Sequence, residues 1–324
     1  MAQSPRISYF DIVKLIAIWL VIWGHTRIEL MHTDWETDRL FQFIYSFHMP
    51  LFMLTSGLFA EKSFSMGLWP ITKKKFKQII LPALEMGVVV YAAQCLFGKT
   101  FGFVDFCKYE VMNFWFLKAL FLCYLIGWVC WKAGRFKWIV FGAITILFLA
   151  LQHWNMTCFK LGAMLPFFAF GILAKRHLSV LQAHSPLLLV GAIICFSLLF
   201  HFYSLDNTFL AMPFLSISLT SFVNYGIYLA TGLMGSVAVI FGCILLKNKT
   251  EQTTIYQLLT NIGQHTLGIY LWQNLLLEFL LPHFLSIDSQ EAYLTVPITI
   301  GISILVLLAC YGICIIPQNI RTNA

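Results

Sequence analysis

Two ionisable side chains share one face of an apolar segment near the N-terminus. Lys14 and His25 flank the ten uncharged residues "LIAIWLVIWG". In an α-helix this separation is about three turns, so both side chains lie on one face, about 16 Å apart along the axis. Asp11, one turn before Lys14, is placed to pair with it. Because ionisable groups inside a membrane need a partner or a cavity, this polar stripe predicts a functional surface.

The histidines of this region are the candidates for proton transfer. An imidazole exchanges its proton near neutral pH, so His25 is the candidate general base. Glu29, one turn further along a continuing helix, is placed to orient it. His48, in "FHMPLFMLTSG", is a second catalytic candidate. A hydrogen-bonded structural histidine beside the distortion at Pro50 explains His48 equally well, and a snorkelling lysine with an interfacial histidine is the alternative for the first stripe.

The composition predicts an all-α, polytopic membrane protein. Hydrophobic residues make up 60% of the 324 residues and charged residues only 11%, against about a quarter charged in soluble domains. Runs of roughly 17–25 apolar residues can cross a bilayer. Such runs, about ten in all, lie near 9–26, 40–60, 78–97, 112–131, 136–152, 159–174, 186–204, 221–246, 256–281 and 293–316. The stretch 209–220 is interpreted as a loop or a re-entrant segment.

The distribution of basic residues predicts the orientation. If the N-terminus is cytoplasmic, most of the 21 Lys and Arg residues fall on the cytoplasmic side. This distribution is the expected one, because cytoplasmic loops of membrane proteins are enriched in Lys and Arg. The basic residues left on the outer side are Arg27, Arg39, Lys99, Lys108 and Lys160. Both termini are therefore expected in the cytoplasm. The formal net charge of +7 follows from this topology and requires no nucleic-acid partner.

The chain is expected to be a single membrane domain over 1–324. Asp11 and Lys14 interrupt the first apolar run, and no small-residue cleavage site follows it, so it is not expected to be a signal peptide. No repeat, linker or soluble block is evident, and no appended soluble domain is expected. The nine cysteines include no CxxC pair, and no metal site is predicted because no set of ligands has the required spacing.

Several motifs together resemble one family. "YFDIVKLIAIWLVIWGH" and "FHMPLFMLTSG" resemble the opening of the acyltransferase-3 family. These are integral membrane O-acyltransferases of bacteria, with a basic residue and a histidine separated by ten residues. "KKFK" is similar to the family's basic pair, with Lys74 and Lys77 in place of arginines. "NFWFLKALF" resembles its Trp-Phe-Leu element, and "GQHTLGIYLWQ" its late motif, which often ends in His where this chain has Gln273.

The resemblance implies transfer of an acyl group, usually acetyl from acetyl-CoA, to a hydroxyl of a cell-surface or exported carbohydrate. It implies a multi-pass protein of the bacterial cytoplasmic (inner) membrane. His25, His48 and Glu29 then become the catalytic candidates, and Lys14, Lys74, Lys77 and Trp115 the candidates for binding the acyl donor. For the basic cluster at 73–77 (Lys73, Lys74, Lys75 and Lys77), enrichment of basic residues on the cytoplasmic side is an equally good explanation. Direct attack by the hydroxyl is favoured over an acyl-histidine intermediate.

Two other functions fit a polytopic protein with buried charges. A transporter or flippase for a glycan or lipid-linked sugar would be expected to show repeated halves with broken helices, and no repeat is evident. A membrane acyltransferase that uses lipid-type acyl chains would differ in its donor preference. A purely structural subunit would not need ionisable groups aligned on one face.

Topology is testable by labelling. A single cysteine introduced at Lys99 in a background without the native cysteines should react with a membrane-impermeant maleimide added outside intact cells, and one introduced at Lys249 should react only after permeabilisation. The reverse pattern would show that the orientation is inverted.

Overall fold

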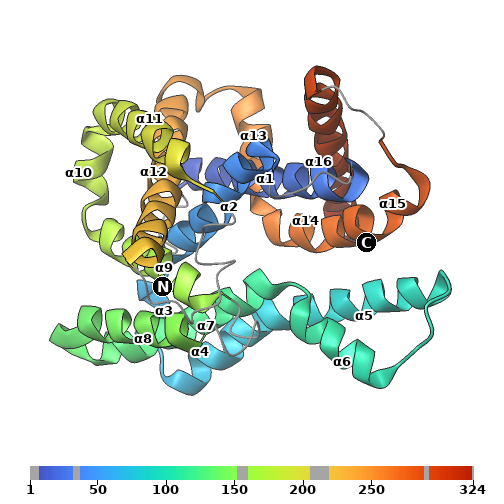
Figure 1. Ribbon diagram of the computed structural model, residues 1–324, viewed down its shortest axis with the longest axis horizontal. Helices are drawn as coiled ribbons and strands as arrows, with labels where there is room; N and C mark the ends of the chain where they lie inside the picture. Colours follow the sequence, from blue (N-terminus) through green and yellow to red (C-terminus); the bar gives the residue numbers. More distant parts are fainter. Residues whose placement is uncertain (1–6, 32–36, 152–159, 205–218, 288–291, 323–324) are drawn as a thin grey trace. The chain divides into compact units, whose positions relative to one another are not determined.

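The computed structural model describes residues 7–31, 37–151, 160–204, 219–287 and 292–322. Every regular element in these ranges is helical, as the sequence predicts (Figure 1). The stretch 209–220 lies almost wholly outside the described residues. The all-α class is therefore confirmed for the described residues.

Among the described residues, seven helices are long and apolar enough to cross a bilayer. They are Tyr9–Met31, Leu68–Leu96, Trp115–Lys132, Gly134–Leu151, Ser185–Phe202, Leu219–Thr250 and Thr295–Ile316. Within the predicted run 40–60 the chain is helical up to Leu58, and the predicted run 159–174 is helical from Leu161; the run 256–281 is divided among several helices. The chain is thus a multi-pass membrane protein, whereas the count of about ten spans and the orientation of the termini stay predictions.

The helices fall into two compact units, each made of discontinuous segments of the chain. The first unit contains α1 (Tyr9–Met31), α13 (Thr254–Gln264), α14 (Thr266–Gln273), the π-helix η4 (Asn274–Leu280), α15 (Leu281–Phe284) and α16 (Ala292–Thr322). The second contains α3 (Glu61–Phe64), α4 (Leu68–Lys75), the π-helix η1 (Phe76–Ile80), α5 (Leu81–Leu96), α6 (Phe103–Met112), α7 (Trp115–Lys132), η2 (Gly134–Phe136), α8 (Lys137–Leu151) and α9 (Leu161–Arg176). Helices α2 (Arg39–Leu58), α10 (Leu178–Ala183), α11 (Ser185–Phe202) and α12 (Leu219–Thr250) contribute residues to both. The prediction of a single domain is not tested by this division.

Helix α1 is the core of the first unit. About four fifths of its membrane-length window is buried (78%), and it packs against α13, α14, α16 and η4. The approach of α13 is close, since a Cβ on Gly263 would lie 2.0 Å from the Asp11 carbonyl oxygen. A helix covered on several sides has to be apolar around most of its circumference. This explains the uninterrupted apolar run between Lys14 and His25.

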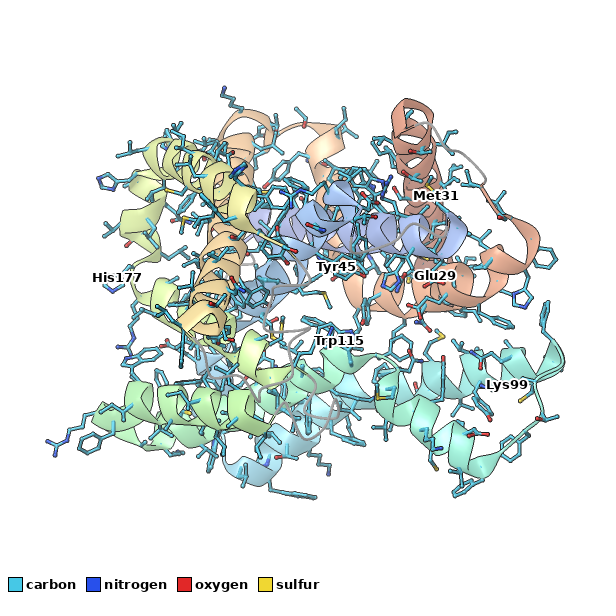
Figure 2. All side chains as sticks on the ribbon, viewed as in Figure 1. Glu29, Met31, Tyr45, Lys99, Trp115 and His177 are labelled. Carbon is cyan, nitrogen blue, oxygen red and sulfur yellow. The ribbon has the colours of Figure 1, made fainter. Side chains whose placement is uncertain are left out.

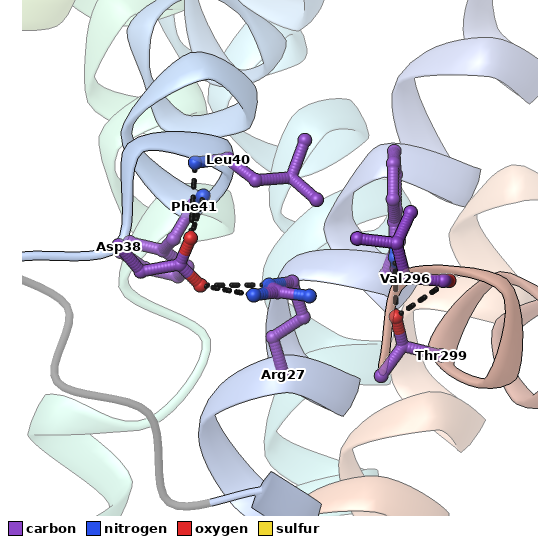
Figure 3. Close-up of polar contacts among 7 residues, drawn as sticks. Arg27, Asp38, Leu40, Phe41, Val296 and Thr299 are labelled. Atoms are coloured by element: carbon purple, nitrogen blue, oxygen red, sulfur yellow. Dashed lines mark hydrogen bonds and ion pairs between the residues drawn. The ribbon is translucent and has the colours of Figure 1, made fainter. Parts of the chain in front are cut away.

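Two tryptophans fix α1 against α16. The indole N–H groups of Trp19 and Trp23 donate to Ser303 Oγ and Thr299 Oγ1, each at 3.0 Å. Thr299 Oγ1 in turn donates to the Val296 carbonyl (Figure 3). A buried indole N–H without an acceptor is costly, so these hydroxyls set both the rotation and the axial position of α1 relative to α16.

A buried ion pair fixes the C-terminal end of α1 to the start of α2. Arg27 Nε and Nη2 both lie 2.7 Å from Asp38 Oδ2 (Figure 3). The other carboxylate oxygen of Asp38 accepts from the backbone N–H groups of Leu40 and Phe41, as a helix N-cap does. Helix α1 extends to Met31, beyond its predicted end at 26, and therefore carries Arg27 into this pair.

Glycines bring two helices of the second unit into contact. A Cβ on Gly57 would lie 2.1 Å from the Phe168 carbonyl oxygen, and one on Gly171 would lie 2.1 Å from the Leu54 carbonyl oxygen. Neither position has room for a side chain. Small residues permit this kind of close helix crossing in membranes, so the α2–α9 contact explains the Ser-Gly ending of "FHMPLFMLTSG".

A lysine closes the corner between α6 and α7. Lys118 Nζ donates to the carbonyl oxygens of Glu110, Val111 and Asn113 at the end of α6, where the helix dipole favours a cation. Burial raises the pKa of Glu110, and the nearby Lys118 opposes that rise. On the preceding α5–α6 hairpin, Lys99 Nζ lies 4.4 Å from the Tyr91 ring centroid (Figure 2).

The Arg27–Asp38 pair yields a stability prediction. Removing one partner of a buried pair typically costs about 3–5 kcal/mol, and Asp38→Ala also removes the N-cap of α2. Asp38→Ala should therefore lower the thermal midpoint of the detergent-solubilised protein strongly. The control is Lys247→Ala, which breaks an exposed pair with Glu251, expected to contribute about 0–1 kcal/mol. Equal midpoints for the two variants would show that the buried pair does not stabilise the fold.

Candidate active site

The structure brings His25 together with an acid from the far end of the chain. His25 Nδ1 lies 3.4 Å from Glu278 Oε1. A quarter of the His25 side chain and a third of the Glu278 side chain remain exposed (25% and 33%). The two groups are within ion-pair distance, but they are not aligned as a hydrogen bond, because Nδ1 has no hydrogen-bond partner among the described residues. A carboxylate at this nitrogen favours the imidazolium that forms when the other nitrogen takes up a proton.

Further polar side chains surround this pair. Glu29, the predicted orienting residue, is within electrostatic reach of His25, and both Glu29 and Glu278 are within reach of Tyr45 on α2. Tyr270 on α14 is within reach of Glu278 and Tyr45. Figure 2 shows Glu29 on α1 and Tyr45 on α2. The cluster therefore draws on four elements of the first unit: α1, α2, α14 and η4.

The glycine before His25 explains how Tyr45 reaches the cluster. A Cβ on Gly24 would lie 2.9 Å from Tyr45 Cε2. Glycine at this position therefore lets the phenol ring pack directly on the backbone of α1. The Tyr45 ring also contacts His48, with centroids 4.6 Å apart.

A π-helical segment presents Glu278. Helix α14 ends at Gln273 and continues as η4, Asn274–Leu280; π-helical turns are rare and frequently mark functional sites. The Asn274 side chain, 4% exposed, hydrogen-bonds the Glu278 carboxylate. The predicted span 256–281 is thus interrupted, first at His265 between α13 and α14 and then by the π-helix.

Lys14 is paired as the sequence predicts. Its Nζ lies 2.6 Å from Asp11 Oδ1, and the Asp11 side chain is almost fully buried. About a third of the Lys14 side chain is exposed (32%), which leaves part of the ammonium group accessible. This geometry is compatible with a structural ion pair and with a contact to an anionic ligand, so the donor role of Lys14 stays a prediction.

His48 has a local hydrogen bond. Its Nδ1 lies 2.8 Å from the Ile44 carbonyl oxygen, so Nδ1 carries the proton and Nε2 is the acceptor nitrogen in the neutral ring. The side chain is buried. The structural explanation for His48 therefore has direct support, and its catalytic role stays a prediction.

The basic cluster at 73–77 differs in exposure from residue to residue. Lys73, Lys74 and Lys77 are exposed at the end of α4 and in η1. Lys75 instead lies with its Nζ 3.6 Å from the centroid of the buried Tyr124 ring. A cation over an aromatic face is attracted by the ring quadrupole. Lys75, which the sequence gave no reason to separate from its neighbours, is thus the inward-facing member of the cluster.

Trp115 lies at a strained helix start in the second unit. Phe114, directly before it, has φ +50°, a conformation that is unusual for a bulky residue and is often retained at functional sites. Lys160, also at positive φ (+53°), begins α9 and places its Nζ 4.7 Å from the Trp115 ring centroid. The structure therefore gives Trp115 a cationic neighbour, and its role in donor binding stays a prediction.

No metal centre is found in the part of the chain that the structure describes. There, no three His, Cys, Asp or Glu side chains are grouped so that they could hold a metal ion. The polar groups that the described site offers are a histidine, carboxylates, an amide and phenols.

The sequence marks Glu278 as an acid inside an apolar run, for which a proton-transfer or substrate-binding role and a buried structural acid are equally good explanations. Sequence reasoning missed its contact with His25, and it missed Asn274 in the same run. Gln273 is 1% exposed, and its Oε1 has no hydrogen-bond partner in the described ranges. Its neighbours four residues away, Ile269 and Leu277, are fully buried, so Gln273 lies on the packed face of this segment.

Comparisons with known proteins show the family of the chain. A family described as an acyltransferase domain matches residues 7–315. The chain is 27% identical over 209 residues to nodulation protein NolL of Sinorhizobium fredii (strain NBRC 101917 / NGR234), covering 58% of this chain and 56% of that protein. It is 30% identical over 145 residues to nodulation protein NolL of Mesorhizobium japonicum (strain LMG 29417 / CECT 9101 / MAFF 303099), covering 40% and 38%. The matches thus span less than two thirds of either relative, and no solved structure matches the chain.

Proposed function

We propose that this protein transfers acetyl from acetyl-CoA to a hydroxyl of a cell-surface or exported carbohydrate. The chain belongs to the acyltransferase-domain family and is therefore an acyltransferase. The contact between His25 and Glu278 carries this proposal, because it supplies a base with a countercharge in a membrane-embedded cluster. A carbohydrate acceptor is what the resemblance of the sequence motifs implies, and no nucleic-acid partner is needed.

His25 is proposed as the general base. A sugar hydroxyl is too weak an acid to attack a thioester unaided, so a base must remove its proton in the transition state. Because Nδ1 faces Glu278, the other ring nitrogen, Nε2, would take this proton. The imidazolium formed in that step would be stabilised by the Glu278 carboxylate, with Glu29 as a second nearby acid.

The atoms of the transfer balance without a metal. The acceptor oxygen forms a bond to the thioester carbonyl carbon while its proton moves to His25. The carbon–sulfur bond then breaks, the acetyl ester is released, and the imidazolium proton passes to the CoA thiolate. A histidine that attacked the thioester itself would instead form an acyl-enzyme before the acceptor arrived, and we propose direct attack.

The donor is proposed to be bound by basic side chains. CoA carries phosphates, and a lysine binds phosphate as a point charge. Lys14, Lys74, Lys77 and Trp115 are the residues that the resemblance implies, and Lys75 is added because of its inward position. The proposed location is the bacterial cytoplasmic membrane, where acetyl-CoA is supplied from the cytoplasm.

Substitution of the His25–Glu278 pair tests the mechanism. His25→Ala should lower turnover by about 10²–10⁴-fold, the range expected for loss of a general base. Glu278→Gln should lower it by about 10–100-fold, because a charge-assisted contact is worth about 1.5–3 kcal/mol. The acidic limb of its pH–rate profile should also move to lower pH, since the imidazolium loses its countercharge. The measurement is acetyl transfer by purified protein from labelled acetyl-CoA.

Thermal midpoints and CoA binding of both variants should match the wild type, and Glu251→Gln, which alters an exposed acid, is the control. Near-normal turnover in His25→Ala would remove His25 from the chemistry. Labelled His25 in the absence of acceptor would change its role from base to nucleophile.

Donor binding is testable within the basic cluster. Lys75→Ala should raise the Kd for acetyl-CoA by about 5–10-fold, because a cation held inside the protein is worth more to a phosphate than a solvated one. Lys73→Ala, with an exposed side chain, is the matched control and should change the Kd less than twofold. Isothermal titration of the purified variants measures both. Equal Kd values for the two variants would place Lys75 outside the donor site.

A further inference from the structure

One buried polar atom of the cluster is left without a partner in the described residues. Asn274 is 4% exposed, and its Oδ1 has no hydrogen-bond donor there. The same side chain hydrogen-bonds the Glu278 carboxylate. An ionised carboxylate can only accept hydrogen bonds, so the amide N–H is the donor. A buried amide oxygen without a donor is costly, and native proteins keep few such atoms.

The helix face that carries Asn274 is the face of the active site. Tyr270, Asn274 and Glu278 recur every four residues, and the outer two members are linked electrostatically to Tyr45 and His25. Glu278 at the end of this row is a third exposed. The neighbouring row of Ile269, Gln273 and Leu277 is fully buried instead. Asn274 is therefore oriented toward the reacting groups, unlike Gln273.

The chemistry of the unpartnered atom selects its ligand. Amide and carboxylate oxygens accept hydrogen bonds, so they need a ligand that donates. The phosphates and the thioester carbonyl of an acyl-CoA are acceptors and cannot satisfy Asn274 Oδ1. A hydroxyl can. Because Asn274 is one hydrogen bond from Glu278, which is 3.4 Å from His25, a hydroxyl at Oδ1 would be close to the one that reacts.

We propose that Asn274 binds the acceptor through a hydroxyl adjacent to the hydroxyl that His25 deprotonates, so that the acceptor is a vicinal diol. This inference rests on the proposed function and adds the class of acceptor to it. The amide has two tasks: its N–H holds Glu278, and its oxygen positions the diol. The oxygen is enclosed in the free protein, so the diol enters beside the partly exposed His25 and Glu278 and rotates the amide toward itself.

Periodate tests the diol directly. Membranes of a host strain that lacks the gene supply the native acceptor, and purified wild-type protein with labelled acetyl-CoA measures its acetylation. Periodate cleaves bonds between vicinal hydroxyls, and borohydride then reduces the aldehydes formed. Acetylation of the oxidised acceptor should fall by about 10-fold or more relative to acceptor treated with borohydride alone, as expected for loss of a buried hydrogen bond with its partner left unpaired. Equal acetylation would overturn the diol.

Variants of Asn274 test the residue. Asn274→Leu should raise the KM for the native acceptor by about 10-fold and leave the KM for acetyl-CoA unchanged, with a lower kcat because Glu278 loses its anchor. Asn274→Asp keeps an oxygen acceptor, so its acceptor KM should stay within about threefold of the wild type while kcat falls. Gln273→Met, one residue away on the packed face, is the matched control and should leave both KM values unchanged.

The outcomes separate this inference from the proposed function. If wild-type protein transfers no acetyl to untreated acceptor, the proposed function fails. If transfer occurs and Asn274→Leu has the wild-type acceptor KM, only the role of Asn274 fails. If Asn274→Leu does not fold, the preserved acceptor KM in Asn274→Asp and the periodate result still support or overturn the diol.

Discussion

The cost of placing charge in a low-dielectric environment governs the first unit. On α1, each ionisable side chain whose contacts are described lies near an opposite or complementary group: Lys14 pairs with Asp11, Arg27 with Asp38 and His25 with Glu278. Removing one partner of the buried Arg27–Asp38 pair leaves a buried charge, which is strongly destabilising. These pairs therefore restrict where α2 and η4 can lie along α1, and the same restriction brings Glu278 to the histidine.

Apolar and small residues make this electrostatic arrangement possible. The indoles of Trp19 and Trp23 hold α1 on α16 through hydroxyl acceptors. Gly24 and Gly263 allow Tyr45 and α13 to approach the backbone of α1. The π-helix η4 then changes the phase of the segment that follows α14. The position and rotation of α1, together with the helical phase of η4, determine which side chains surround His25.

Local patterns in the sequence predicted much of this arrangement. The apolar runs predicted helices, and the spacing of Asp11 and Lys14 predicted their ion pair, because both signals lie within a few helical turns. The approach of Glu278 to His25 joins residues at opposite ends of the chain, so no local periodicity could reveal it. The inward position of Lys75 depends on the Tyr124 ring from α7, a contact that the sequence of the basic cluster alone could not reveal.

A double-mutant cycle of His25 and Glu278 tests most directly whether the pair acts as one unit. The logarithm of kcat for acetyl transfer would be compared in wild type, His25→Ala, Glu278→Gln and the double variant. If Glu278 acts through His25, its substitution should have almost no further effect once His25 is removed, so the two effects should be strongly non-additive. Additive losses in the double variant would contradict the account, since they would show that the two side chains contribute independently.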